Sequence, residues 1–539
     1  MERNNTRIGE YMYSYNEVFE ASKEYFDGDE LAASVFAGKY ALQDTEGNYL
    51  ELCPDDMHKR LAEEFARIEN KYENSMSYKE IYSLFKDFKY VVPQGSPMSG
   101  IGNTAKIQSL SNCFVIESPA DSYAGILKTD QEQVQIMKRR GGVGFDISTI
   151  RPKGMYTSNA AKTTDGIEVF LDRFSNSCRE VAQGGRRGAL MLSISVHHPQ
   201  VMDFIEIKRD LTRVTGANIS VRLTDEFMKA VQEEEEYQQR WPVDASNPEV
   251  SKSASANEVW DALIEGAHAS AEPGVLFWDT AKRMTPSDAY EDLGFGSVST
   301  NPCGEIILSP YDSCRLMLVN LTSFVSNPWT KNACFEFGDF RNVTKKAQRL
   351  MDDMIDLEMG QIDKILAKID LDPESDEVKY YERSLWHNIR QAALQGRRTG
   401  LGITGLGDAL AMLGQRYGSE ESINTTEEIY KWLSLASYEE SIQLAKERGS
   451  FPIFDHQKEA GHEFLTRIIN ELTPEAREDY NKFGRRNIAN TTTAPAGSVS
   501  CLTQTTSGIE PAFMLYYKRR KKVQNGEEVM FVDDLGDEW

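Results

Sequence analysis

The sequence predicts an α/β fold with a largely parallel sheet, preceded by a helical segment over residues 1 to about 90. In DMHKRLAEEFARI, the apolar residues Met57, Leu61 and Phe65 recur at the spacing of one helical face. From residue 91 to residue 220, short apolar runs alternate with glycine-rich turns and helical stretches. Such alternation is typical of β/α units, in which helices cover a parallel sheet.

Three apolar runs in this second region are candidate strands: CFVI at 113–116, VGFDI at 143–147 and ALMLSISV at 189–196. Each run has the length of a buried strand and lies between turn-forming segments. Further along, a long amphipathic helix is expected over residues 344–369, with its methionines turned inward. A later helix should end at Gly449, because glycine commonly follows the last helical residue.

The overall charge excludes some partners. Lys and Arg total 60 and Asp and Glu total 84, which gives a net charge of −24. Such a charge repels nucleic acid and anionic membranes, although a locally positive pocket could still hold a nucleotide. No stretch approaches the roughly 18 to 20 apolar residues that span a bilayer, and the N-terminus has no signal-peptide core. We therefore expect a cytoplasmic protein that binds neither nucleic acid nor membrane.

The cysteines do not form a disulfide framework. There are seven, which is few for the length, and they are widely spaced without a CxxC pair. The histidines do not combine with them at zinc-binding spacing, so we expect no metal site.

The segment NPCGEIILSPYDSC carries the most chemical information. Asn301, Cys303 and Glu305 alternate, so on an extended strand or a loop tip their side chains would point the same way. A thiol can exchange a hydrogen atom, a carboxylate can take a proton, and an amide can hold a hydroxyl. The set therefore suits radical and acid–base chemistry on a hydroxylated substrate. The residues by themselves favour the other interpretation, a Pro-Cys-Gly turn that buries its cysteine.

The NPCGE segment resembles the finger loop of ribonucleotide reductases, particularly the cobalamin-dependent ones. LSNCFVIESPADS at 110–122 resembles the segment with the family's first redox cysteine, here Cys113, and DSC at 312–314 resembles the second, here Cys314. APAGSVSCLTQTTSGIEP at 494–511 resembles the phosphate loop followed by the GIEP signature. These matches occur in family order, so the sequence is identified as a member of this family.

The resemblance implies reduction of a ribonucleotide to a deoxyribonucleotide for DNA precursor synthesis. Cys303 would become a thiyl radical that abstracts the ribose 3′-hydrogen. Glu305 would act as general base on the 3′-hydroxyl, and Asn301 would orient the substrate. Cys113 and Cys314 would supply two electrons and finish as a disulfide, which a dithiol reductant such as thioredoxin or glutaredoxin would reduce again.

The phosphate loop would hold the substrate phosphates, because small residues let backbone N–H groups approach an anion and hydroxyls add donors. Its expected members are Ala496, Gly497, Ser498, Val499 and Ser500. Without the resemblance, a Ser/Gly-rich surface loop is the default interpretation. A second glycine-rich stretch, Gly400 to Gly405, fits GxGxxG, but no strand is expected before it. We interpret it as close backbone packing and not as a dinucleotide site.

The stretch SCREVAQGGRRGA at 177–189 resembles the loop that relays the identity of a bound effector to the active site. Gln183, Gly185 and Arg187 would be its working residues, and Asp121 and Arg151 would belong to the effector site. The expected effectors are deoxynucleoside triphosphates and ATP.

By resemblance, residues 91–539 form a ten-stranded α/β barrel of two parallel five-stranded halves, with the finger loop near 301–305 in the middle. We expect no N-terminal ATP-cone domain. The family's barrel needs further strands after GIEP, and little sequence follows Pro511. The C-terminal strands are therefore expected to be missing, and a separate C-terminal polypeptide would complete the barrel. A homodimer is also possible.

The source of the radical is the main open question. The motifs favour adenosylcobalamin over a class I large subunit that needs a metallo-radical partner subunit. Such a subunit would carry two relay tyrosines after the phosphate loop, and Tyr516 and Tyr517 follow GIEP too closely. Two rival functions are a catalytically inactive nucleotide-binding relative and a glycyl-radical enzyme. The intact cysteine set opposes the first, and the lack of a recognisable glycyl-radical loop opposes the second. Whether the substrate is a diphosphate or a triphosphate stays open.

Overall fold

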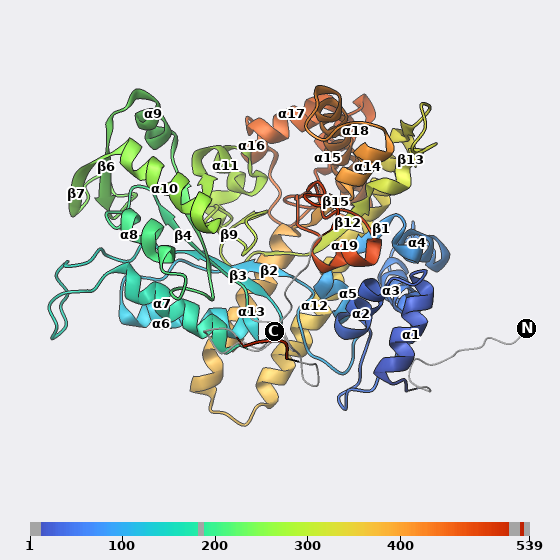
Figure 1. Ribbon diagram of the computed structural model, residues 1–539, viewed down its shortest axis with the longest axis horizontal. Helices are drawn as coiled ribbons and strands as arrows, with labels where there is room; N and C mark the ends of the chain where they lie inside the picture. The colour runs from blue at the N-terminus through green and yellow to red at the C-terminus, as the bar shows by residue number, and fades with distance from the viewer. Residues whose placement is uncertain (1–11, 182–187, 517–528, 533–539) are drawn as a thin grey trace, which may run out of the picture.

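A six-stranded sheet forms one lobe of the computed structural model, which describes residues 12–181, 188–516 and 529–532 (Figure 1). Five strands, β2, β3, β4, β5 and β8, run parallel to their neighbours, and β11 pairs antiparallel with β2 at one edge. In sheet order the strands are β11 (Ser313–Cys314), β2 (Cys113–Val115), β3 (Gly142–Asp146), β4 (Leu190–Ser195), β5 (Asn218–Leu223) and β8 (Gly274–Phe277).

Helices cross between these parallel strands, and the central strands are buried on both faces. Every residue of β2, β3 and β4 is buried, as expected for strands that helices cover on both sides. The three predicted apolar runs supply these strands, so the predicted β/α region is confirmed. The helices of this lobe are α6 (Tyr123–Met137), α7 (Ile167–Glu180), α8 (Val201–Glu206), α9 (Asp225–Glu233), α10 (Ala256–Ser270) and α11 (Trp278–Met284). A hairpin of β6 (Glu236–Trp241) and β7 (Val250–Ser255) lies between α9 and α10.

A second sheet has the order β1-β12-β15, with strands Val91–Pro93, Leu316–Asn320 and Gly400–Thr404. β12 is parallel to β15 and antiparallel to β1, and Thr491 adds a single parallel bridge to Leu401. Only Arg315 separates β11 from β12, so the chain passes directly from one sheet to the other. The first sheet thus contains the five parallel strands expected for one barrel half, and within the described residues β12 and β15 represent the other.

The N-terminal segment is helical, as predicted. Its helices are α1 (Tyr15–Tyr25), α2 (Glu30–Lys39), α3 (Pro54–Glu69), α4 (Tyr78–Phe85) and the 3-10 helix η1 (Lys86–Phe88). Ser14 and Ser77 begin α1 and α4 with reciprocal capping boxes, which satisfy backbone N–H groups at the helix start. These helices share one apolar core with the second sheet and the long helix α12. A division of the chain near residue 90 therefore stays a prediction.

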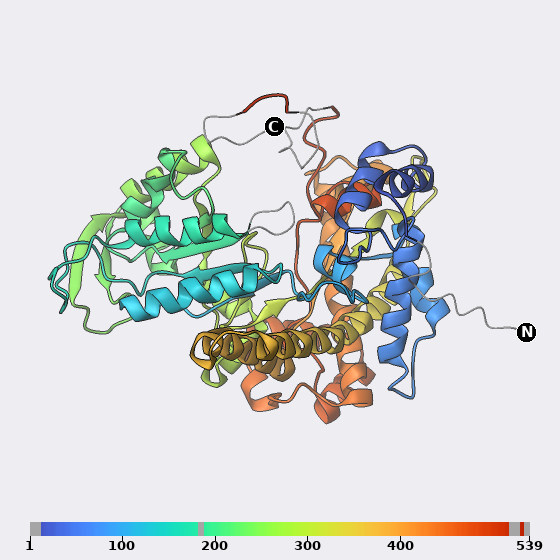
Figure 2. The ribbon, with the colours of Figure 1, turned by 90° about the horizontal axis from the view of Figure 1, so that it is seen from below.

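Helix α12 (Phe337–Leu371) runs along the molecule from one lobe to the other, beside α13 (Asp376–Gly396) (Figure 2). The predicted helix at 344–369 lies within it, and Met351 and Met354 are fully buried. Helix α15 (Glu420–Arg448) packs against α12 and ends before Gly449, as predicted. The remaining elements are α5 (Gly95–Gly100), η2 (Ile207–Arg209), η3 (Pro286–Leu293), η4 (Leu321–Phe324), β13 (Val325–Ser326), β14 (Cys334–Phe335), α14 (Leu406–Met412), α16 (His456–Glu459), α17 (Glu463–Glu471) and α18 (Pro474–Phe483).

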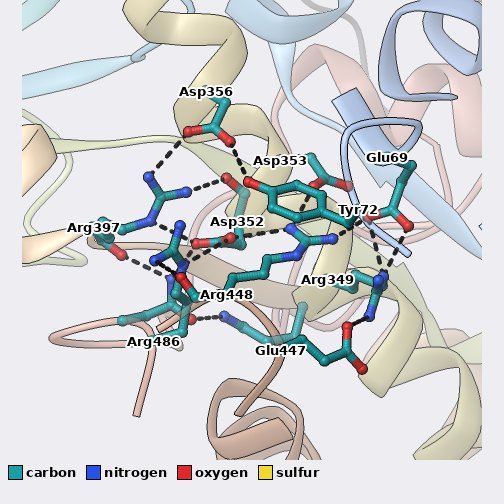
Figure 3. Close-up of polar contacts among 12 residues, drawn as sticks. Glu69, Tyr72, Arg349, Asp352, Asp353, Asp356, Arg397, Glu447, Arg448 and Arg486 are labelled. Carbon is teal, nitrogen blue, oxygen red and sulfur yellow. Dashed lines mark hydrogen bonds and ion pairs between the residues drawn. The ribbon is translucent and has the colours of Figure 1, made fainter. Parts of the chain in front are cut away.

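A buried network of ion pairs, here called the Arg448 network, joins the N-terminal helices to these long helices (Figure 3). The Arg448 side chain pairs with Glu69 of α3 and with Asp352 and Asp353 of α12, and all four side chains are fully buried. The guanidinium also lies over the Tyr72 ring, 3.8 Å from its centroid. The network further includes Arg349, Asp356, Arg397, Glu447 and Arg486. No spacing of residues in the sequence predicts the Arg448 network, because its members come from separate segments of the chain.

Within the described ranges, no helix combines the length and the apolar character needed to cross a bilayer.

Candidate active site

The NPCGE segment forms the loop of a short hairpin toward the middle of the molecule (Figure 1). Strands β9 (Ser299–Thr300) and β10 (Ile307–Leu308) pair antiparallel on either side of it. The Asn301 backbone N–H donates to the Ile306 carbonyl at 3.3 Å, and the Gly304 N–H donates to the Asn301 carbonyl at 3.0 Å. Gly304 has a φ of +80°, a conformation that glycine adopts without strain. The hairpin therefore presents Cys303 at its tip, where the side chain is exposed.

Asn301 fixes the neighbouring carboxylate. Its side-chain N–H donates to Glu305 Oε2 at 2.5 Å, and its Oδ1 accepts from the Ile306 N–H at 3.2 Å. Asn301 is fully buried, so these partners hold the amide in one orientation. The Glu305 carbonyl in turn accepts from Thr492 Oγ1 at 2.9 Å. The sequence placed Asn301 and Glu305 in one site, and the structure brings them into direct contact.

Cys113 and Cys314 lie directly opposite each other across β2 and β11. Both are buried free thiols. Opposed residues in an antiparallel pair have Cβ atoms about 4.5–5.5 Å apart, and a disulfide needs about 3.5–4.5 Å. A small adjustment would therefore let the two sulfurs bond. The Asn301 amide also lowers the pKa of Cys113, against the larger effect of burial, so this amide lies near both the cysteine pair and Glu305.

The surroundings keep all three thiols protonated at neutral pH. Burial raises the pKa of Cys113 and Cys314 well above the ordinary value, and the charge of Glu305 raises both further. Desolvation by the surrounding protein and the same carboxylate raise the pKa of Cys303 to about 11, although its side chain reaches solvent. Burial also raises the pKa of Glu305, against the hydrogen bond from Asn301. Such a site holds transferable hydrogens beside a carboxylate that can take a proton.

Glycines allow the hairpin and the cysteine pair to pack this closely. A Cβ at Gly144 of β3 would lie 1.8 Å from the Thr300 carbonyl oxygen, and one at Gly142 would lie 2.9 Å from Pro302. A Cβ at Gly400, at the start of β15, would lie 2.6 Å from Cys314 Sγ. The GxGxxG stretch therefore serves close packing beside the cysteine pair. The sequence analysis missed the role of Gly142 and Gly144. The pattern GGVG within an apolar run could have indicated it, because glycine inside a strand often marks the close approach of another backbone.

Replacing Gly144 by alanine is expected to displace the hairpin. The added methyl group meets a backbone carbonyl that cannot rotate away, and overpacking of this kind costs about 1–3 kcal/mol. Thermal unfolding should show a lower Tm, and the rate at which iodoacetamide alkylates Cys303 should change. Gly360→Ala on α12 is the control, because a Cβ there meets nothing within 4 Å. An unchanged Tm and an unchanged alkylation rate in Gly144→Ala would contradict this prediction. They would show that β9 accommodates the added methyl group without displacing the hairpin.

The predicted phosphate loop leads into the short helix α19 (Ser498–Thr503). The N–H groups of Ala496 and Gly497 donate to Ser507 Oγ at 3.1 and 3.3 Å. The Ser498 hydroxyl lies 2.6 Å from the Tyr40 hydroxyl, at the end of α2. Ala496 and Val499 are buried, whereas Gly497 is exposed. The backbone N–H groups thus already point at one oxygen, as a phosphate-binding loop requires.

The loop lies near the hairpin. Thr492 bonds the Glu305 carbonyl, and the Cα atoms of Thr492 and Ala496 can be at most about 14 Å apart because they are close in sequence. The structure therefore brings the predicted phosphate loop to the same region as Asn301, Cys303 and Glu305.

Asp121 and Arg151, the two described residues of the predicted effector site, pair with each other. Arg151 Nε donates to Asp121 Oδ2 at 2.7 Å, and its backbone N–H donates to Asp121 Oδ1 at 3.0 Å. The Arg151 guanidinium also faces the Trp241 ring, 5.8 Å from its centroid. Gln183, Gly185 and Arg187 lie outside the described residues. The effector assignment therefore stays a prediction, and a local ion pair between two loops accounts equally well for Asp121 and Arg151.

Further residues support the site without having been predicted. Asn218 Nδ2 donates to the Pro302 carbonyl at 2.8 Å and anchors the hairpin to β5. Arg315, which follows Cys314 in the chain, and Arg398 are also buried, and their charges lower the pKa of Cys314 against the larger effect of burial. Their contacts depend on chain segments that only the fold brings together, so no sequence pattern could have found them.

The comparisons agree with these motifs. A sequence model of the family described as ribonucleotide reductase, barrel domain, matches residues 111–537. The chain is 29% identical over 497 residues to a vitamin B12-dependent ribonucleoside-diphosphate reductase of Mycobacterium tuberculosis, covering 90% of this chain and 62% of that protein. It is 31% identical over 474 residues to the protein of that name from Thermoplasma acidophilum, covering 87% and 52%. A ribonucleoside-diphosphate reductase large chain of Neurospora crassa is 25% identical over 448 residues, covering 76% and 45%. The chain thus spans less than two thirds of the length of these relatives.

Proposed function

The chain belongs to the ribonucleotide reductase family, and we propose from this membership and the site geometry that it reduces a ribonucleotide to a deoxyribonucleotide. One observation carries the proposal: Asn301 holds Glu305 by a hydrogen bond behind the exposed Cys303, and Cys113 and Cys314 lie opposite each other, close enough to Glu305 for its charge to raise the pKa of both thiols. This arrangement places a hydrogen-atom carrier, a general base and a two-electron donor in one site. The relatives act on ribonucleoside diphosphates by name, so a diphosphate is the proposed substrate.

The residues divide the reaction among them. The Cys303 thiyl radical takes the ribose 3′-hydrogen and returns a hydrogen atom to that carbon at the end. Glu305 takes the proton of the 3′-hydroxyl, and Asn301 orients the substrate. The 2′-hydroxyl leaves as water, and the Cys113 and Cys314 thiols supply two electrons and two hydrogens as they form a disulfide. The sum is one ribonucleotide and two thiols giving one deoxyribonucleotide, one water and one disulfide.

Adenosylcobalamin is the proposed source of the radical, because two of the relatives are vitamin B12-dependent by name. When bound, it would supply an organic radical able to take the hydrogen atom of a thiol. The site fits a bulky cofactor: Cys303 is exposed at the hairpin tip, whereas Cys113 and Cys314 are buried. The competing proposal is a metallo-radical partner subunit, as in large chains of the Neurospora type.

A turnover assay separates these proposals. The full chain is given a ribonucleoside diphosphate and dithiothreitol, with adenosylcobalamin or without it, and deoxyribonucleotide is measured by chromatography. Product that depends on adenosylcobalamin supports the proposal. Product only after addition of a metallo-radical subunit supports the competing source. Tight nucleotide binding without product under every condition would indicate a binding protein.

The reactivity of Cys303 tests its raised pKa without turnover. Iodoacetamide reacts with the thiolate, and at pH 8 a thiol of pKa about 11 is ionised in about one molecule in a thousand. The alkylation rate of Cys303, followed by peptide mass spectrometry, should therefore rise about tenfold per pH unit up to about pH 10. Glu305→Gln should accelerate alkylation at pH 8, because the Glu305 charge helps to raise this pKa. A rate that instead levels off near pH 9 would show that Cys303 is a thiol of ordinary pKa.

Other partners remain part of this proposal. A dithiol reductant and deoxynucleoside triphosphate effectors follow from the proposed reaction, as does a cytoplasmic location.

A C-terminal polypeptide is proposed because Met514, Leu515 and Tyr516 are exposed large apolar side chains, which another chain could cover. A homodimer is proposed because α6 and α7 expose Leu127 and Val169 along an open groove. Size-exclusion chromatography with light scattering tests the dimer.

A further inference from the structure

The base of the NPCGE hairpin is fixed to the first sheet by buried groups. Ser299 Oγ lies 2.8 Å from Ser193 Oγ of β4, and both side chains are fully buried. The Val298 carbonyl accepts from Arg222 Nη1 of β5 at 3.2 Å. Asp146 of β3 joins these two contacts, because its Oδ2 accepts from Ser193 Oγ at 3.0 Å and lies 2.9 Å from Arg222 Nε. Three neighbouring strands therefore hold the base of the hairpin.

The tip of the hairpin is held differently. Asn218 Nδ2, at the start of β5, donates to the Pro302 carbonyl at 2.8 Å. In the part of the chain that the structure describes, no other group from outside the hairpin forms a hydrogen bond with Pro302, Cys303 or Gly304. The Pro302 ring also approaches Gly142 of β3, but an apolar contact has no direction, whereas a hydrogen bond does. One side chain thus supplies the directional contact between the tip and the sheet.

The bonded carbonyl lies one peptide unit from Cys303. Because a peptide unit is planar, holding the Pro302 oxygen also fixes the Cys303 nitrogen and the direction from which the chain enters the Cys303 Cα. On the other side of Cys303, Gly304 forms the tight turn at a φ of +80°, and its N–H donates to the Asn301 carbonyl. The position of the Cys303 sulfur therefore depends on Asn218 on one side and on this turn on the other.

Hydrogen-atom transfer is sensitive to such placement. Reacting atoms must approach to about 3–3.5 Å, and a displacement of about 1 Å can lower the rate about a hundredfold. The Asn218 side chain is exposed, so its replacement should disturb little of the core. Loss of this side chain should therefore affect the geometry of the tip more than the stability of the fold.

We propose that Asn218 is a positioning residue, which holds the tip of the hairpin so that the Cys303 sulfur meets the substrate carbon in one place. The part played in hydrogen transfer rests on the proposed function, whereas the hold on the tip rests on the contact between Asn218 and Pro302. Asn218 needs no contact with the substrate, because it acts through the peptide unit that precedes Cys303.

The first experiment measures the hold on the tip without turnover. Hydrogen exchange followed by mass spectrometry is compared in the full wild-type chain and in Asn218→Ala. The amides of Asn301, Gly304 and Ile306 are hydrogen-bonded within the hairpin. Peptides that contain them should exchange about fivefold faster in the variant, because one hydrogen bond of ordinary strength is lost. The Tm and the exchange in α12 should stay at the wild-type values.

Two further variants separate the hydrogen bond from other effects. Ser326→Ala is the matched control, since Ser326 Oγ also donates to a backbone carbonyl, that of Cys334 in the β13–β14 hairpin. It should leave exchange in the NPCGE hairpin unchanged. Asn218→Asp keeps the shape of the side chain, but an ionised carboxylate only accepts hydrogen bonds. It should therefore behave like Asn218→Ala, and it answers the same question if Asn218→Ala fails to fold.

The second experiment measures the consequence for the reaction. Under the conditions that support wild-type turnover, Asn218→Ala should lower kcat about tenfold or more and leave KM near the wild-type value, because the substrate still binds while the sulfur is misplaced. The isotope effect of a 3′-deuterated ribonucleotide should increase, since hydrogen transfer becomes slow relative to the other steps. A merely structural role would reduce the amount of folded enzyme and leave KM and the isotope effect unchanged. Ser326→Ala should match wild type in all three measurements.

Several outcomes overturn the inference and leave the proposed function intact. They are wild-type exchange in the NPCGE hairpin of Asn218→Ala and Asn218→Asp, a kcat that stays at the wild-type value, and a lower kcat without a larger isotope effect. A higher KM at an unchanged kcat also overturns it, because Asn218 would then bind the substrate. If the wild-type chain has no turnover with any radical source, the proposed function fails, and the exchange experiment alone decides whether Asn218 holds the tip.

Discussion

Replacing Cys303 by serine is expected to abolish turnover and to leave the fold intact. The side chain is exposed at the hairpin tip, so an isosteric change disturbs no core contact. A serine hydroxyl does not form the radical that takes the ribose hydrogen, so the loss should exceed about a hundredfold, or about 2.7 kcal/mol of barrier. The measurement is deoxyribonucleotide production under the conditions that support the unsubstituted chain, with circular dichroism to confirm the fold.

Cys334→Ser is the matched control, because Cys334 is also exposed but lies on β14, outside the hairpin and the cysteine pair. It should retain wild-type turnover. Cys113→Ser and Cys314→Ser should block repeated turnover, since the electron pair cannot be delivered. More than about a hundredth of wild-type activity in Cys303→Ser would remove Cys303 from the proposed role.

The motifs predicted the composition of the site better than its supporting contacts. Asn301, Cys303 and Glu305 are close in sequence, so one hairpin was enough to bring them together. The pairing of Cys113 with Cys314 came from family resemblance, because nothing in the spacing of two distant cysteines fixes a strand register. The structure supplies that register directly.

The strands of the first sheet were predictable because their apolar runs are buried on both faces and stand between turn segments. The contacts of Gly144, Arg315 and Arg398 were not, because each depends on two chain segments that meet only in the folded protein. For the same reason, the sequence treated α12 as an amphipathic helix with methionines inward. It did not reveal that Asp352 and Asp353 on the same helix are equally buried.

Those two aspartates lead to the second large expected effect, in the Arg448 network. Arg448→Met should destabilise the protein by about 3–5 kcal/mol, because it leaves buried carboxylates without the cation they share. Three carboxylates lose a partner at once: Glu69, Asp352 and Asp353. Because Glu69 belongs to α3 and the aspartates to α12, the loss should loosen the N-terminal helices from the long helices. Hydrogen exchange followed by mass spectrometry should show faster exchange in α3, together with a lower Tm.

The control is Arg383→Met, because Arg383 also pairs with aspartates but is part-exposed on α13. An exposed pair of that kind contributes at most about 1 kcal/mol, so its Tm and its α3 exchange should stay near wild type. Arg448→Lys should fall between the two, since it keeps the charge but loses the fork that contacts three carboxylates. Adding Asp353→Asn to Arg448→Met should recover part of the loss, because Arg448 is the only ion-pair partner of Asp353 among the described residues and the double variant removes the charge left unpaired. Equal stability of Arg448→Met and Arg383→Met would mean that the buried carboxylates are neutral in the folded protein. The N-terminal helices would then be held by their shared apolar core alone.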